Sequence, residues 1–142
     1  EGIKTIFNDS FETLKNLPKK DRIKYTFSKA SELFTELEIF LDDYTMRREK
    51  QGIMVKAIMP ESKRAEIYKK KVHVGTTQVR MLPRDIDFHF ESNISIYADK
   101  VAIMSLNEER LHGVIIESLE IATPQKAIFS LAWRSCKETM GL

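Results

Sequence analysis

The segment 22–59 constrains the fold of this chain more than any other part. Residues 22–28 alternate polar and apolar side chains, which is typical of a β-strand. Residues 32–51 carry an apolar stripe at helical spacing, with acidic residues near the start and basic residues near the end, and Gly52 is placed to end that helix. The run 53–59 is almost continuously apolar, as in a strand buried on both faces. This order of elements predicts a βαβ unit with two parallel strands.

The rest of the chain adds helices and mostly short strands. Apolar spacing predicts helices over 3–17 and 61–70, and strands over 77–82, 93–97, 101–106 and 112–117. A hairpin turn is expected at Ala98–Asp99–Lys100, and a last helix is expected to start at Thr123, with Pro124 as its first helical residue. We therefore predict an α/β fold: one domain over 1–142, with a mixed β-sheet and helices on both faces.

Composition excludes several classes of protein. The 142 residues carry a net charge of +2, with acidic residues interspersed among the basic runs, so a dedicated DNA-binding face is not expected. A single cysteine cannot form an internal disulfide, which favours a reducing, cytoplasmic location. No apolar run approaches the length of a membrane helix, so no membrane partner is expected. Glycine-rich phosphate loops and the GxSxG nucleophile motif are also absent from the sequence.

The sequence offers two candidate reactive sites, a possible metal-ligand set and a cysteine. If 85–89 is a strand, Asp85, Asp87 and His89 share one face and could hold a divalent ion, but polar side chains alternating outward explain the same pattern. Cys136 lies on the apolar side of the last helix, where thiols are usually inert. We therefore predict no metal site, no cofactor and no nucleophilic cysteine.

Taken together, several segments resemble the effector region of TrmB-like transcriptional regulators. They are GIKTI (2–6), RREKQGIMVKAIMP (47–60), VRMLP (79–83), NISIYADKVAIMS (93–105), GVIIES (113–118), QKAIF (125–129) and LAW (131–133). The resemblance implies that a winged helix-turn-helix domain precedes Glu1 in the parent protein and makes the DNA contacts. It also implies that this chain is a ligand-sensing and dimerisation domain with the fold of half a phospholipase D-like domain.

The active phospholipase D-like enzymes carry a His-x-Lys-x4-Asp motif on a strand–turn–strand. Aligned with that hairpin, this sequence has Glu91 for the histidine nucleophile, Asn93 for the lysine and Ala98 for the aspartate. Without the imidazole there is no covalent phosphoryl intermediate, so we expect a catalytically inactive relative rather than an enzyme. Two alternatives stay open: a phosphodiesterase-like hydrolase with a divergent active site, and a structural dimerisation module without a ligand.

An effector site is expected at the carboxyl ends of the parallel strands, where open α/β sheets bind ligands. Ser28 and Ser31 lie between the first strand and the long helix, where hydroxyl and backbone N–H groups suit a small polar or anionic effector. Arg80 and Asn93 are expected to supply further donors. The two serines would equally serve as caps of the helix.

A homodimer is expected, because a regulator that reads a two-fold DNA site needs two DNA-binding heads. Phe129 and Trp133 lie four residues apart on the last helix, partly off its Ala127–Ile128–Leu131–Ala132 stripe, and were considered as anchors of the interface. The alternative is that both aromatic side chains complete the core of one chain.

Overall fold

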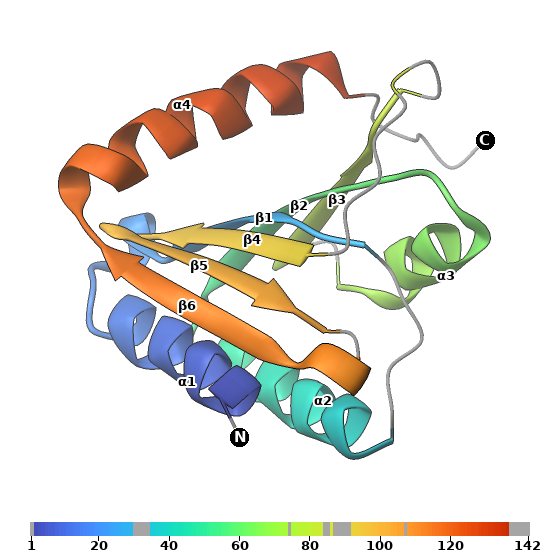
Figure 1. The fold of residues 1–142 in the computed structure, drawn as a ribbon, viewed down its shortest axis with the longest axis horizontal. Coiled ribbons are helices and arrows are strands. Elements are labelled where there is room, and N and C mark those ends of the chain that lie inside the picture. Colours follow the sequence, from blue (N-terminus) through green and yellow to red (C-terminus); the bar gives the residue numbers. More distant parts are fainter. Residues whose placement is uncertain are drawn as a thin grey trace.

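The computed structural model shows a mixed six-stranded sheet with helices on both faces (Figure 1). It describes residues 2–29, 35–73, 75–83, 86, 92–106 and 108–136. The elements are α1 (Gly2–Lys15), η1 (Lys19–Asp21), β1 (Ile23–Phe27), α2 (Thr35–Lys50), β2 (Met54–Met59), α3 (Lys63–Lys71), β3 (Thr77–Met81), β4 (Ser92–Tyr97), β5 (Lys100–Ser105), η2 (Glu108–Arg110), β6 (His112–Glu117) and α4 (Leu119–Ser135). Within these residues, no helix is long and apolar enough to cross a membrane.

The sheet has a parallel half and an antiparallel half that meet between β1 and β4. Its strand order is β3-β2-β1-β4-β5-β6, with β1 and β3 both parallel to β2 and all other pairs antiparallel. The predicted βαβ unit is therefore confirmed, and Gly52 ends α2 with a φ of 65°. In the predicted hairpin, Tyr97 pairs with Lys100 across a turn in which Ala98 has a φ of 55°.

Three helices lie on one face of the sheet and α4 lies on the other. Buried residues of α1 and α2 pack against Tyr97, Ala102 and Met104, while α3 covers the β2–β3 edge around Ala57 and Val79. Because side chains alternate along a strand, the intervening residues of the same strands face α4. The mixed α/β class with helices on both faces is confirmed.

The sheet-facing side of α4 differs from the one that its aliphatic residues suggest. Phe129 is 1% exposed and packs on the rings of Tyr25 and Phe27, with Trp133 stacked against it. Phe129 therefore completes the core of its own chain, and its interpretation as a dimer anchor is wrong. The aliphatic Ile128 and Leu131 point instead to solvent. The physical reason is area: aromatic rings bury more apolar surface per residue than aliphatic side chains.

The start predicted for the last helix is also wrong. The helix α4 begins at Leu119 and is capped by Ser118, whose Oγ accepts a hydrogen bond from the Ile121 N–H at 3.3 Å. Pro124 consequently lies inside the helix, where it leaves the carbonyl of Glu120 without its helical donor. Both residues are exposed, so water can satisfy that carbonyl, and the serine cap outweighs the proline as a start signal.

Candidate functional site

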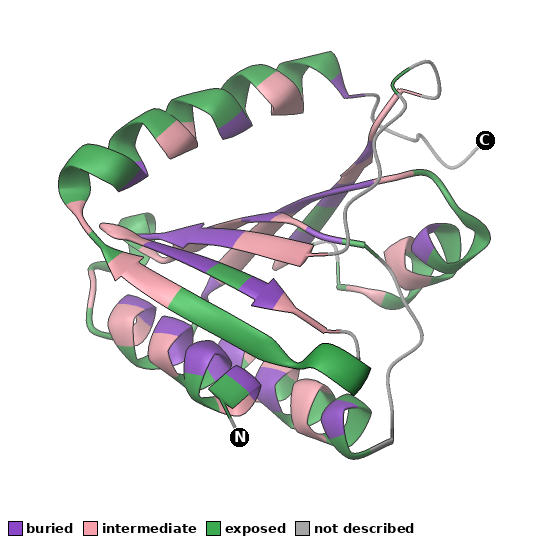
Figure 2. Cartoon of the chain, in the orientation of Figure 1, coloured by how far each residue is buried: buried purple, intermediate pink, exposed green. Residues whose placement is uncertain are grey.

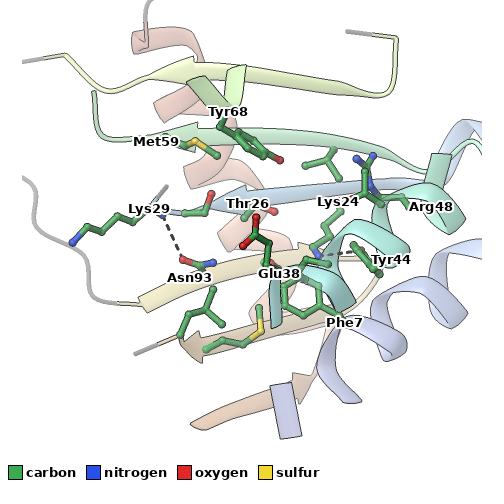
Figure 3. Close-up of a pocket in the computed structure, with 18 of the residues that line it drawn as sticks. Phe7, Lys24, Thr26, Lys29, Glu38, Tyr44, Arg48, Met59, Tyr68 and Asn93 are labelled. Atoms are coloured by element: carbon green, nitrogen blue, oxygen red, sulfur yellow. Dashed lines mark hydrogen bonds between the residues drawn. The ribbon is translucent and has the colours of Figure 1, made fainter. Parts of the chain in front are cut away.

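A cavity of about 680 Å³ lies between the sheet and the helices α2 and α3 (Figure 3). Five basic and two acidic side chains are among the described residues that line it. The lining residues are Phe7, Lys24, Thr26, Ser28, Lys29, Glu38, Leu41, Asp42, Tyr44, Thr45, Arg48, Val55, Ala57, Met59, Arg64, Ile67, Tyr68, Lys71, Asn93, Ser95, Met104 and Leu106. The cavity therefore combines apolar walls with an excess of positive charge.

The floor of the cavity is built from β1 and β4, the two strands at which the sheet changes from parallel to antiparallel. Lys24, Thr26 and Ser28 occupy alternate positions along β1 and its carboxyl end, so their side chains share one face. Thr26 is paired with Ser95 of β4, and this register brings Asn93 beside Ser28. The chain leads from β1 to β2 on one side and from β4 to β5 on the other, so the two connections run in opposite directions along the sheet. Ligands of open α/β sheets bind at such a switch point.

The ammonium group of Lys24 is buried in this floor with no acidic partner among the described residues. The residue is 4% exposed, and its Nζ donates to Tyr44 Oη at 3.2 Å. The same Nζ lies 4.6 Å from the ring centroid of Phe7 and 5.1 Å from that of Tyr44. In the part of the chain that the structure describes, no carboxylate lies within 4.0 Å of it. A buried ammonium that only dipoles and ring faces compensate attracts an anion.

Tyr44 reports on the same electrostatic environment. Burial alone raises the pKa of its phenol, but the Lys24 ammonium, the hydrogen bonds shared with Ser10 and Lys24, and the charge of Arg48 together outweigh burial, so that the pKa falls below its ordinary value. Ser10 Oγ and Tyr44 Oη share a 3.0 Å hydrogen bond, which fixes the ring. Positive charge and hydrogen bonding thus together reverse the usual effect of burial on the pKa of a phenol.

Two hydroxyl groups beside Lys24 have no hydrogen-bond partner among the described residues. Thr26 is 9% and Ser95 is 1% exposed, and both hydroxyl oxygens are buried. Leaving a buried hydroxyl unpaired costs about 1–3 kcal/mol. Because the two side chains are cross-strand neighbours on the cavity floor, a single bound group can hydrogen-bond to both.

The other basic groups of the cavity wall have different roles. Arg48 is 3% exposed, and its guanidinium donates to the carbonyls of Ile53 and Thr76 and to Thr77 Oγ1. These bonds tie the end of α2 to the start of β2 and β3, which makes Arg48 a structural residue. At the rim, Lys71 lies 3.9 Å from an Asp42 carboxylate oxygen, and both are exposed. Lys24 is therefore the cation that a deeply bound group would meet.

The structure brings together two of the four predicted site residues. Ser28 and Asn93 both line the cavity, and Asn93 Oδ1 accepts a 3.4 Å hydrogen bond from the Lys29 N–H. Arg80 lies on the opposite face, where its guanidinium donates to the Trp133 carbonyl at 2.8 Å and lies 4.3 Å from the centroid of that ring. It is thus separated from the cavity by the sheet. Ser31 lies outside the described residues.

None of the described residues that line the cavity is a candidate for metal binding or nucleophilic catalysis from the sequence. Asp85, Asp87 and His89 lie outside the described residues, within which no group of three potential metal ligands occurs. Cys136 is buried under α4, where burial raises the pKa of its thiol despite the nearby Arg80. A raised pKa reduces the thiolate fraction and hence the reactivity of this cysteine.

Sequence reasoning missed Lys24, Thr26 and Ser95. A signal for the β1 residues was present, because Lys24, Thr26 and Ser28 are polar at i, i+2 and i+4 and must face a helix layer if the sheet is covered on both sides. Polar side chains in that position need partners or a ligand.

No protein-family model matches this chain, and no curated protein matches it. A functional proposal therefore rests on the cavity and on the segments that resemble TrmB-like regulators.

Proposed function

We propose that this chain is the ligand-sensing and dimerisation domain of a TrmB-like transcriptional regulator, and that a small anionic effector binds in the cavity above β1 and β4. The observation that supports it best is the cluster of Lys24, Thr26 and Ser95, a buried cation beside two hydroxyls that have no hydrogen-bond partner in the described part of the chain. A carboxylate or phosphate group supplies both the negative charge and the acceptors that this cluster lacks.

In this proposal, the chain has the fold of half a phospholipase D-like domain and lacks the catalytic residues of the enzymes. Asn93 and Ala98 stand where the enzymes have a lysine and an aspartate, and the hairpin that carries them is formed by β4 and β5. Asn93 lines the cavity, so the position that serves catalysis in the enzymes would serve binding here. A neutral amide donates hydrogen bonds to an anion but lacks the positive charge with which the enzymes' lysine stabilises phosphate.

Regulation requires that the effector prefer one arrangement of the protein over another. The cavity lies between the sheet and two helices, α2 and α3, that are fastened to it by different contacts. A ligand that bridges β1, β4 and these helices changes the relative free energies of the arrangements in which the helices pack on the sheet. In a dimer, such a change would alter the separation of two DNA-binding heads and therefore the affinity for DNA.

Anion binding is tested directly on the purified 142-residue chain. Inorganic phosphate and acetate are titrated while thermal unfolding is followed, with chloride at matched ionic strength as the reference. We expect a saturable rise of the midpoint with one of the two anions, and a loss of affinity of about tenfold or more in Lys24→Met. Lys56→Met is the matched control, because Lys56 lies on the neighbouring strand but faces Trp133 on the opposite side of the sheet. Equal losses in both variants, or no saturation, would contradict the site.

The hydrolase alternative is tested on generic aryl phosphodiesters, with and without divalent metal ions. We expect no turnover by the chain. Turnover that survives repurification and disappears in Asn93→Ala would establish the enzyme and overturn the regulatory proposal.

For the regulatory part, the isolated chain is expected to bind duplex DNA only weakly and without sequence preference. A sub-micromolar, sequence-dependent affinity would place DNA recognition in this chain itself.

A further inference from the structure

The outer side of α4 exposes a stripe of apolar residues at the spacing of a coiled-coil seam. Ile121, Pro124, Ile128 and Leu131 follow one another at intervals of three, four and three residues. The three aliphatic members are 43%, 53% and 65% exposed, respectively. Figure 2 shows this helix exposed along most of its outer side. We refer to these four residues as the α4 stripe.

The α4 stripe is separate from the side of the helix that packs on the sheet. That inner side is formed by Ala122, Phe129 and Cys136, which are all buried. Folding of one chain therefore leaves the stripe in water. A contiguous apolar surface with regular spacing is typical of a docking site for another helix.

Charged residues beside the stripe indicate what docks there. Glu120, Ala127 and Arg134 follow one another at intervals of seven residues, so they form a line along one border of the stripe. Among the described residues, neither Glu120 nor Arg134 forms an ion pair within the chain. The border thus carries an acidic side chain at one end, a small side chain in the middle and a basic side chain at the other end.

This pattern is self-complementary when two copies of α4 lie antiparallel. Ile121 then packs against the partner helix at the level of its Leu131, and Pro124 at the level of its Ile128. In the same register, Glu120 faces the arginine at position 134 of the second copy, and the two alanines at position 127 meet near the two-fold axis. A parallel pair would instead place like charges at the same level.

We propose that the α4 stripe is the surface on which a second copy of this chain docks, with the two α4 helices antiparallel. The inference deepens the dimerisation part of the proposed function by naming its interface, and it does not depend on the cavity. A helix of 17 residues is about 25 Å long and provides less area than a standard interface. The dissociation constant of the isolated chain is therefore expected to be on the order of micromolar.

Sedimentation of the purified chain over a range of concentrations tests this surface. We expect a monomer–dimer equilibrium that Ile128→Glu weakens by about 100-fold or more, since the change buries a charge in the seam. The matched control is Ile39→Glu on α2, which is at least as accessible, at 66% exposure, and should leave the equilibrium unchanged. Both positions are exposed, so both variants should retain the circular dichroism of the parent.

A charge exchange tests the antiparallel arrangement and the identity of the partner. Glu120→Arg and Arg134→Glu should each weaken the dimer by about tenfold, because each variant creates like-charged pairs. The double variant should return to within about threefold of the parent. A monomer at all concentrations up to about 100 μM would overturn the proposal. So would a double variant that stays as weak as the single ones, or an equal effect of Ile39→Glu. Each of these results leaves anion binding in the cavity intact as a separate question.

Discussion

Two lysines on the same face of the sheet have opposite surroundings. Lys24 of β1 pairs with Tyr97 of β4, and Tyr97 pairs with Lys100 of β5, so the three residues form one row across neighbouring strands. Lys100 Nζ lies 3.2 Å from both carboxylate oxygens of Asp9 and donates to Thr13 Oγ1 at 3.0 Å. Lys24 has aromatic rings and one phenol around it, and no described carboxylate within reach.

The difference separates a structural cluster from a binding cluster. Asp9 also accepts a 2.9 Å hydrogen bond from Tyr97 Oη, so that a single carboxylate of α1 satisfies two groups of the β4–β5 hairpin. Every member of that cluster has its partner, which fastens the helix to the sheet. Around Lys24 the described residues provide no carboxylate, and the two hydroxyls without a described partner lie on the same side of the floor. Polar groups that cost stability are retained in proteins where function needs them.

The largest effect is expected when the structural cluster is broken. Asp9→Ala should lower the free energy of unfolding by about 2 kcal/mol, because Lys100 and Tyr97 lose their common acceptor while remaining mostly buried. Urea denaturation at neutral pH measures this change. The control is Asp43→Ala, which removes an exposed pair with Arg47 within α2 and should cost about 0.5 kcal/mol or less. Equal losses in the two variants would mean that the Asp9 cluster is not a structural fastening.

The two lysines themselves should respond in opposite directions to the same substitution. In buffer without a binding anion, Lys100→Met should lower the free energy of unfolding by about 1 kcal/mol, because it leaves the Asp9 carboxylate without its cation. Lys24→Met should leave it unchanged or raise it by up to about 1 kcal/mol, since the cost of burying an unpaired ammonium disappears. If Lys24→Met destabilises as much as Lys100→Met, Lys24 is a structural residue and the comparison fails.

The smallest effect concerns two tyrosines that extend the same contrast. Burial, together with the hydrogen bond to Asp9, raises the pKa of Tyr97 above its ordinary value of 10.0, whereas the pKa of Tyr44 is lowered beside Lys24. Above pH 10 the unfolded phenol releases its proton while folded Tyr97 keeps it, so Tyr97 makes stability fall as pH rises. Tyr44 has the opposite sign: it makes stability rise between its lowered folded pKa and 10.

Urea midpoints at a series of alkaline pH values should reveal both signs. Relative to the parent, Tyr97→Phe should make the decline of stability with pH shallower, and Tyr44→Phe should make it steeper. Tyr25 and Tyr68, whose pKa values burial also raises, are present in all three proteins and cancel in the comparison. Slopes that change in the same direction in both variants would contradict the assignment of opposite environments.

Most of the helices and strands, and their order, follow from local sequence patterns. Strand and helix periods differ, so the βαβ unit, the β4–β5 hairpin and the strand 112–117 could be located without tertiary information. Gly52 and the position of the hairpin turn were also readable, because their backbone chemistry is local. The start of α4 was misplaced, since Thr123–Pro124 and Ser118 are both valid start signals and the choice between them depends on packing.

Which side of each helix or strand packs against a neighbour depends instead on contacts between distant segments. A period of two places Arg80 on one face of β3 and the cavity-lining residues of β1 on one face of that strand, but it does not say whether those faces coincide. The register shows that they are opposite, which takes Arg80 away from Ser28 and Asn93 and brings Lys24, Thr26 and Ser95 together. The helix α4 has two apolar sides, and the sheet selected the aromatic one because it buries more area. Such choices depend on contacts between residues far apart in the chain, and local spacing carries no information about them.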